Sequence, residues 1–231
     1  MIRPGASWGG AVPAGTPVRE VTGDDAALAA AAAPGVVLRL GTGSTAELAR
    51  ALGLARPGAG PGTTVVDCDL IDLAPPAPDA ADAGPIAAVA ANAAANAVVL
   101  GIPPDALRAW HRRRPVTVTV DGRALFAGPA TTVVVANGQF LRGADLVPRG
   151  HPGDGRLEVQ VYGLAPGERG PMRRRLGGGD HVPHPRITQG QGRRIDVRWA
   201  RPAALEVDGR RRDRVAGLVA RVRPGALRVL V

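Results

Sequence analysis

The chain has 231 residues, of which 45% are apolar, enough for one large domain or two small domains with a sizeable core. Only 3% of the residues are aromatic, so the core has to be built mainly from Val, Leu and Ala. A single cysteine, Cys68, excludes an internal disulfide and a cysteine-based zinc site, and its apolar surroundings predict a buried small hydrophobe. No signal peptide opens the sequence and no segment is apolar enough for a membrane span, so we expect a cytoplasmic protein.

The net charge of +9 is unevenly distributed, and all 29 basic residues are arginines. Six arginines stand against ten acids before His111, whereas 23 arginines stand against ten acids from His111 onward. The second half is therefore expected to meet anions such as phosphates, an anionic membrane surface or nucleic acid, and the alternative is a solvated basic surface. No nucleic-acid-binding motif accompanies the clusters "HRRRP", "MRRRL" and "GRRRDR", so lipid headgroups or solvent are the preferred partners and no specific nucleic acid is expected.

Residues 1–54 predict a truncated α/β part. A helix is expected over residues 23–33, with Asp24 or Asp25 near its N-terminus, and a short buried strand over 35–40 follows it. A second helix is expected over 44–54, because Ser44 can cap it and Glu47 three residues later completes a capping box. Gly53 is the expected end of that helix. A strand, a turn and a helix in this order indicate an α/β layer.

Residues 55–114 predict a connecting region. Glycine and proline make 55–62 a linker by composition, "TTVVDCDLIDL" predicts a strand, and "APPAPDAADAGP" predicts a flexible loop. Two prolines at 103 and 104 then favour the start of a helix over 105–113.

From residue 115 the pattern changes to many short strands with turns between them. "VTVTVDG" alternates with a period of two and ends in a tight-turn pair, Asp121-Gly122, and "ATTVVVANG" ends similarly in Asn137-Gly138. Five further strand-like segments follow: "GRLEVQVYGL", "RRIDVRWA", "AALEVDGR", "LVARVRP" and "ALRVLV". The predicted fold class is α+β, with a truncated Rossmann-like part before an antiparallel β-sandwich over residues 115–231.

The order of these motifs resembles the diacylglycerol kinase catalytic-domain family, which includes bacterial lipid kinases, sphingosine kinases and the more distant NAD kinases. "LGTGSTAELARALGL" is similar to the second nucleotide-loop motif of that family, and "VVVANGQFLRGADLVPRGHPGDGRLEV" to its C-terminal signature. "GGGDHVPHP", "ALEVDGR" and "RVRPGALRVLV" resemble three later segments, so the resemblance extends over residues 35–231. It implies an ATP-binding α/β domain, a β-sandwich as the other wall of a cleft, Mg²⁺ on the phosphates, and a lipid hydroxyl as the acceptor.

The resemblance also implies site residues. It places a phosphate-binding turn at Gly41, Thr42, Gly43 and Ser44, with Thr42 matching a nucleotide-contacting threonine. Glycines allow the backbone to approach a phosphate, and a helix N-terminus presents N–H groups to it. The alternative is a plain strand-to-helix turn capped by Ser44. Asp154 matches an aspartate of the metal network, as the hard oxygen ligands of Mg²⁺ require, and its alternative is an ordinary Asp-Gly turn.

Three departures from the family pattern bear on catalysis. The opening Gly-Gly-Asp-Gly-Thr motif is absent, with only "TGDDAALAAAAAP" in its place, and the Asn-Asp pair after Gly-Thr-Gly has become Ser44-Thr45. The glutamate that serves as the general base is Arg210 here, which cannot accept a proton because it stays protonated. Asp208 and Asp213 lie nearby, but at the wrong spacing for a substitute.

These observations predict a degenerate lipid-kinase-family protein that keeps a cleft for a lipid or another phosphate-bearing small molecule. One alternative is an active lipid kinase with a rearranged site, which would need ATP and Mg²⁺. The other is a nucleic-acid-binding module driven by the arginines.

Two further groups of residues have structural interpretations. Asp180, His181 and His184 stand close together as in a metal site, but Pro183 and Pro185 prevent a helical face, so a loop is expected. The three tryptophans, Trp8, Trp110 and Trp199, are expected to pack in the interior rather than to stack on bases.

Overall fold

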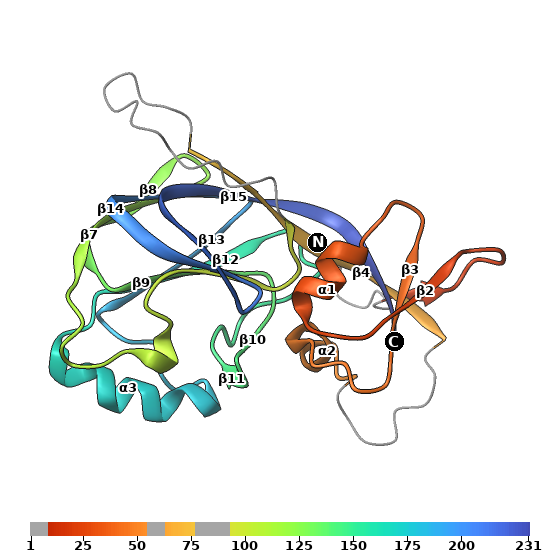
Figure 1. Ribbon diagram of the computed structural model, residues 1–231, viewed down its shortest axis with the longest axis horizontal. Coiled ribbons are helices and arrows are strands. Elements are labelled where there is room, and N and C mark those ends of the chain that lie inside the picture. Colours follow the sequence, from red (N-terminus) through yellow and green to blue (C-terminus); the bar gives the residue numbers. More distant parts are fainter. Residues whose placement is uncertain (1–8, 55–62, 77–92) are drawn as a thin grey trace.

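The computed structural model describes residues 9–54, 63–76 and 93–231 (Figure 1). Most of its strands belong to one 13-stranded, mainly antiparallel sheet, whose main path runs β1-β4-β15-β14-β6-β9-β12-β13. The strands are β1 (Gly10–Ala11), β2 (Val18–Val21), β3 (Val37–Leu40), β4 (Thr64–Ala74), β5 (Ala93–Ala94), β6 (Ala97–Gly101), β7 (Arg114–Val120), β8 (Arg123–Ala130), β9 (Thr132–Ala136), β10 (Phe140–Leu141), β11 (Ala144–Asp145), β12 (Leu157–Tyr162), β13 (Ile187–Gly192), β14 (Arg194–Val207) and β15 (Arg210–Leu230). The helices are α1 (Asp25–Ala31), α2 (Glu47–Ala51) and α3 (Arg169–Arg175), with 3₁₀ turns η1 (Pro104–Ala106), η2 (Pro166–Glu168) and η3 (Leu176–Gly178).

The N-terminal part joins the same sheet. β2 and β3 are parallel, and β3 also runs parallel to the last residues of β15. Asp24 caps α1, its carboxylate accepting from the N–H of Ala27 at 3.1 Å, so the predicted helix and the strand after it are confirmed. The described fold is mostly antiparallel sheet, and the predicted Rossmann-like character of the N-terminal part is not confirmed. The strand β15 pairs with β3 and β4 as well as with β14, so both regions share one sheet. The predicted boundaries at 54 and 114 stay predictions, since strands from all three segments share this sheet.

The predicted start of α2 was wrong. The helix begins at Glu47, its N-cap is Ala46, and no side chain caps it. The hydroxyl of Ser44 instead donates to the carbonyl oxygen of Gly23 at 2.8 Å, as does the N–H of Thr45. Residues 44 and 45 are therefore tied to the loop before α1, which prevents the capping box. Gly53, with φ +75°, ends the helix as expected.

The predicted helix over 105–113 was also wrong, because only the short turn η1 forms there. The buried guanidinium of Arg169 donates to the carbonyl oxygens of Arg108, Ala109 and His111, at 2.8, 2.9 and 2.6 Å. The oxygen of Arg108 also accepts from the N–H of His111 at 3.2 Å, and all three oxygens bind this side chain from α3. The loop after η1 thus takes its shape from a residue about sixty positions later in the chain.

Four of the predicted strands merge into two. "RRIDVRWA" and "AALEVDGR" form β14, and "LVARVRP" and "ALRVLV" form β15. Their prolines coincide with register shifts, at Arg198/Ala203 and Arg223/Leu227, so the strands bulge there instead of ending. Asp121-Gly122 is the predicted tight turn, with both φ angles positive, whereas Asn137 is a buried residue whose amide donates to the carbonyls of Asp69 and Ala95.

Among the described residues the apolar core has one large and three smaller parts, the smallest being Val37, Val65 and Leu230. The largest lies between the layers of the sheet, a second lies under α3, and a third lies between α1, α2 and the strands β3, β4 and β15. Cys68 is fully buried in the third, as predicted. Within the described residues, no helix is both long enough and apolar enough to cross a membrane.

Candidate functional site

The two N-terminal helices meet the sandwich at a junction formed by α1, α2, the β10–β11 hairpin and the turn between β14 and β15 (Figure 1). Gly143 in the hairpin donates its N–H to the carboxylate of Glu47 and accepts from Arg50 at 3.0 Å. The Arg50 guanidinium also lies 4.1 Å from the centre of the Phe140 ring. We call this region the helix–sandwich junction, and it brings together most of the site residues expected from the sequence.

The Gly41–Ser44 turn lies at this junction, but much of its backbone is already bonded. The N–H of Gly41 donates to Val21, and that of Ser44 donates to Gly41. Thr42 and Gly43 are exposed, and their N–H groups form no hydrogen bond within the described part of the chain. Two N–H groups of the predicted phosphate turn are therefore open to a ligand.

A carboxylate of the protein itself binds the N-terminus of α2. Asp25 accepts from the N–H of Leu48 at 2.9 Å and from the side-chain amide of Asn96 at 3.0 Å. Burial, together with the nearby charge of Asp208, raises the pKa of Asp25 to about 7, although the hydrogen bond from Leu48 opposes the shift. An internal anion thus uses the helix N–H group that the resemblance offered to a ligand phosphate.

The turn that contains the expected base position is held by internal contacts too. Asp208 is buried and accepts from three successive N–H groups, those of Ala95, Asn96 and Ala97, at 2.7 to 3.0 Å. Burial raises its pKa in spite of these bonds. Arg210 extends from the same turn and forms a bidentate ion pair with Asp24, at 3.0 and 2.8 Å. The side chain at the expected base position is therefore bound to the carboxylate that caps α1.

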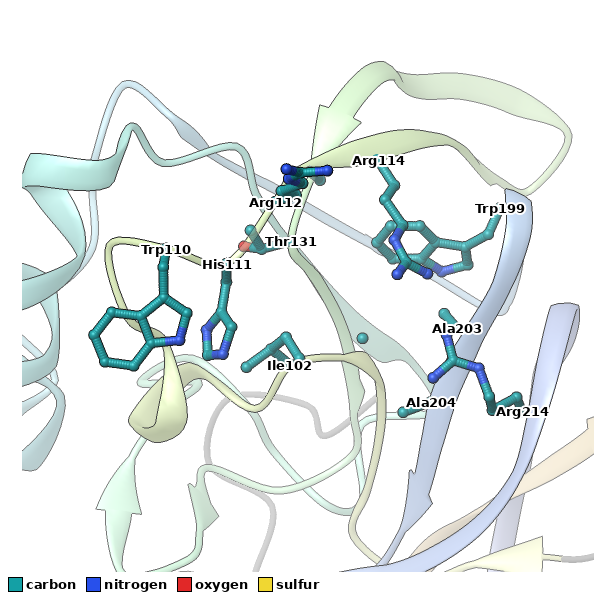
Figure 2. A pocket seen from close by; sticks show the side chains of 12 residues that line it. Ile102, Trp110, His111, Arg112, Arg114, Thr131, Trp199, Ala203, Ala204 and Arg214 are labelled. Carbon is teal, nitrogen blue, oxygen red and sulfur yellow. The ribbon is translucent and has the colours of Figure 1, made fainter.

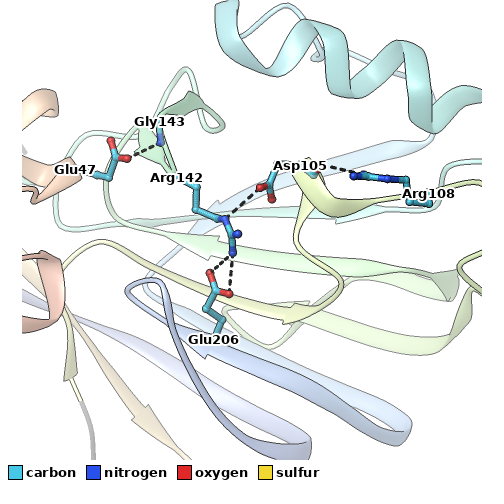
Figure 3. Close-up of polar contacts among 6 residues, drawn as sticks. All are labelled: Glu47, Asp105, Arg108, Arg142, Gly143 and Glu206. Atoms are coloured by element: carbon cyan, nitrogen blue, oxygen red, sulfur yellow. Dashed lines mark hydrogen bonds and ion pairs between the residues drawn. The ribbon is translucent and has the colours of Figure 1, made fainter.

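Arg142, which the sequence analysis did not single out, lies at the edge of the junction (Figure 3). Its guanidinium binds the carboxylates of Glu206, at 3.1 Å, and Asp105, at 3.2 Å. It also lines a pocket of about 400 Å³ between the β10–β11 hairpin and α3, together with Arg173 and Arg174. We call this the arginine pocket. The partners of Arg142 are remote in sequence, so no local motif could have revealed it.

Asp154 lies away from that pocket, in the turn before β12. One carboxylate oxygen accepts from the N–H of Arg156 at 2.9 Å, and the other from the amide of Gln191 at 3.2 Å. Two more carboxylates, Asp69 and Glu158, are close enough for its charge to raise their pKa values, although burial is the larger cause for each. Among the described residues no group of three His, Cys, Asp or Glu side chains could hold a metal ion. Asp154 as a metal ligand stays a prediction.

The remaining candidates have mixed outcomes. His181 is buried and its ring stacks on Tyr162, whose hydroxyl lies 3.3 Å from its Nε2 atom, so it packs within a loop. Trp199 is buried as predicted, but Trp110 is 75% exposed, which contradicts the expectation of interior packing. Trp8 lies outside the described residues.

A family model described as the YegS C-terminal NAD kinase β-sandwich-like domain matches residues 86–231. The match covers well over half of the sequence. The chain belongs to this family. The matched region contains the strands β5 to β15 and includes Arg142, Asp154, Glu206, Asp208 and Arg210. No curated protein matches the chain significantly.

Solved structures show the same fold. A diacylglycerol kinase from Bacillus anthracis str. Sterne superimposes with a TM-score of 0.59 at 15% identity, over 84% of this chain and 66% of that one. Two further structures of candidate diacylglycerol kinases from the same organism give TM-scores of 0.63 and 0.67, each at 15% identity. The first of these two superpositions covers 84% of this chain and 68% of the other chain, and the second covers 92% and 77%. The chain thus has a diacylglycerol-kinase-like fold and spans about two thirds to three quarters of these structures.

Proposed function

We propose that this chain is a degenerate lipid-kinase-family protein that binds a phosphate-bearing lipid, or a related small molecule, without transferring phosphate. One observation carries the proposal. Arg210 stands where the resemblance places the general base, and its guanidinium is engaged in a bidentate pair with Asp24. A general base has to accept a proton from the attacking hydroxyl, which an arginine does not do.

The part of the site that the resemblance assigns to the nucleotide phosphates also departs from what a kinase needs. Asp25 binds the N–H group at the start of α2, which the resemblance offers to a nucleotide phosphate. Loss of a positioned base alone costs roughly 10²- to 10⁴-fold in rate, and loss of phosphate positioning adds to that cost. Thr42 and Gly43 still present two open N–H groups, which is the feature that favours the alternative of an active ATP-dependent kinase.

The arginine pocket supplies the binding function. Arg173 and Arg174 project from the last turn of α3, and neither forms an ion pair within the described ranges. The Nε atom of Arg173 is buried and has no hydrogen-bond partner there. Guanidinium groups bind phosphate through paired N–H donors, so a phosphomonoester headgroup suits this pocket.

The test combines binding and turnover on the same protein. We expect dioctanoyl phosphatidic acid to bind saturably in calorimetric titration, and millimolar Mg-ATP to give no saturable heat. Arg173→Gln together with Arg174→Gln should weaken phosphatidate binding about tenfold or more, because two charge-assisted hydrogen bonds are lost. Arg39→Gln, an exposed arginine on β3, is the matched control.

Three outcomes would contradict the proposal. Formation of phosphatidate from dioctanoylglycerol and Mg-ATP, abolished by Asp154→Asn, would establish the active-kinase alternative. If the double variant and the control bound phosphatidate equally well, the arginine pocket would not be the binding site. A salt-sensitive shift of DNA or RNA with no lipid binding would favour the nucleic-acid alternative.

A further inference from the structure

A second pocket, of about 300 Å³, opens in the sandwich where β14 changes its neighbour. β14 pairs with β7 as far as Trp199 and with β6 from Leu205 onward, and its register against β15 shifts between Arg198 and Ala203. A strand that exchanges partners through a bulge leaves part of its edge unpaired, and this pocket occupies that stretch. We call it the tryptophan pocket; β7 lies at the opposite side of the sandwich from α1 and α2 (Figure 1).

The lining of the tryptophan pocket combines aromatic and cationic side chains. Figure 2 shows Trp110 and His111 on one side and Trp199 and Arg214 on the other, with Arg112 and Arg114 at the top of the view. The lining residues are Gly101, Ile102, Trp110, His111, Arg112, Arg114, Ala130, Thr131, Trp199, Ala203, Ala204 and Arg214. They include three arginines and no acid, so the pocket carries a positive field over an apolar floor.

Two of these arginines are held close together by one acceptor. Arg114 from β7 and Arg214 from β15 both donate to the carbonyl oxygen of Pro202, at 3.5 and 2.6 Å. Across the described segments neither pairs with a carboxylate, and Arg112 does not either. Like charges brought together repel unless an anion lies between them, so this arrangement favours an anionic ligand.

Trp199, one of the lining residues, carries an unpartnered donor. Trp199 is only 6% exposed, and its indole Nε1 is buried without a hydrogen-bond partner in the part of the chain that the structure describes. Buried indole N–H groups usually have an acceptor. An acceptor carried by a ligand would satisfy this donor.

Trp110 supplies an exposed aromatic surface on the side of the pocket opposite Trp199, and contacts elsewhere in the fold hold the loop that carries it. The loop that carries it is held by Arg169, which is 1% exposed and donates to the carbonyls of Arg108, Ala109 and His111. An exposed indole fixed by such an anchor presents a flat apolar face at little entropic cost. Two indoles at opposite sides of a small pocket suit a flat ligand better than a long flexible chain.

We propose that the tryptophan pocket binds a planar aromatic carboxylate. The carboxylate accepts hydrogen bonds from Arg114, Arg214 and the Trp199 indole, and the aromatic body lies against the Trp110 and Trp199 rings. The pocket volume of about 300 Å³ accommodates one or two fused rings. This site is separate from the arginine pocket and does not depend on the function proposed above.

The first experiment uses calorimetric titration of the full chain with three probes. We expect 2-naphthoate to bind saturably and about tenfold more tightly than 2-naphthol, which lacks the charge, and than decanoate, which lacks the ring. Decanoate binding as tightly as naphthoate would indicate an acyl-chain site and overturn the aromatic assignment. If 2-naphthol bound as tightly as 2-naphthoate, the arginines would not contribute to binding, which would contradict the proposal. The absence of any naphthoate binding would also contradict it.

Substitutions locate the binding. Trp199→Phe keeps a ring and removes the N–H, and we expect it, Arg214→Gln and Trp110→Ala each to weaken naphthoate binding about tenfold. Trp110 and Arg214 are exposed, so these two variants keep the test valid if Trp199→Phe fails to fold. Arg39→Gln and the Arg173/Arg174 double variant should bind naphthoate like the wild type. Unchanged binding by all three pocket variants would contradict the proposal.

Discussion

The helix–sandwich junction and the tryptophan pocket both gather charged and polar side chains, but they differ in what those groups bind. At the junction the polar groups bind one another: Arg210 pairs with Asp24, Asp25 binds the N–H of Leu48, and Asp208 accepts three N–H groups. In the tryptophan pocket two arginines donate to one carbonyl, and the Trp199 indole N–H has no partner among the residues that the structure describes.

This difference determines how well each region can bind a ligand. A group that is already bonded within the protein has to break that bond before it can bind anything else, which reduces its contribution to affinity. We therefore propose that the junction, where the family resemblance places the nucleotide site, is mainly a structural connection in this chain. The arginine pocket and the tryptophan pocket instead contain arginines that form no ion pair among the described residues and can bind an anion.

The largest expected effect concerns the anchor of the tryptophan pocket. Arg169→Met removes the buried guanidinium that donates to the carbonyls of Arg108, Ala109, His111 and Leu164, so we expect the free energy of unfolding to fall by about 3–5 kcal/mol. Urea unfolding measures this loss, and naphthoate binding should disappear because the Trp110 loop is released. Arg175→Met, at an exposed position of α3, should change neither, and a similar loss there would show that the effect is not specific.

At the junction, Asp208→Asn should destabilise the chain by about 2 kcal/mol. An amide replaces one of the two acceptor oxygens and presents its own N–H₂ to the N–H groups of residues 95–97. Thermal and urea unfolding measure the change, with Asp213→Asn, an exposed aspartate on β15, as the control. If both variants unfold at the same urea concentration, the three bonds to Asp208 do not stabilise the turn.

The raised pKa of Asp25 predicts that stability depends on pH. Its pKa is about 7 in the folded chain and 3.8 in the unfolded chain, so the unfolded chain binds fewer protons between these values. Stability is therefore highest below pH 4 for this group and falls as the pH rises to about 7, by up to about 4 kcal/mol. Glu158, whose pKa is also raised to about 7, changes stability in the same direction.

Asp25→Asn should remove the part of this dependence that belongs to Asp25. We expect the melting temperature of the variant to fall less than that of the wild type between pH 5 and pH 8, as followed by circular dichroism. Glu158→Gln should remove the second part independently, because Glu158 lies in β12 and not at the junction. A pH profile of Asp25→Asn identical to that of the wild type would contradict the raised pKa.

The smallest expected effect concerns Arg210. Its pair with Asp24 is exposed to solvent, so Arg210→Gln should lower the melting temperature only slightly. Arg210→Glu places an acid against Asp24 and should lower the melting temperature further. The proposed function predicts that this variant does not phosphorylate dioctanoylglycerol. Phosphate transfer by Arg210→Glu would show that this one substitution blocks an otherwise intact kinase.

The order of short strands, the tight turn at Asp121-Gly122, the α1 helix with its Asp24 cap and the buried Cys68 could all be predicted from local sequence. Each depends on residues that are close together in the chain, such as alternating apolar positions or a cap three residues from its N–H donor. The family resemblance likewise depends on short motifs in a fixed order, and the family match to residues 86–231 agrees with it.

What local sequence could not predict was decided by contacts between distant residues. Ser44 donates to Gly23 instead of capping α2, and Arg169 binds carbonyl oxygens of the loop where a helix over 105–113 was expected. Arg142 forms ion pairs with Asp105 and Glu206, which the fold brings beside it. The tryptophan pocket exists because β14 pairs first with β7 and then with β6. Hydrogen-bond donors and acceptors bind whichever partner the folded backbone brings within reach, so only the tertiary structure could decide which of them stay free.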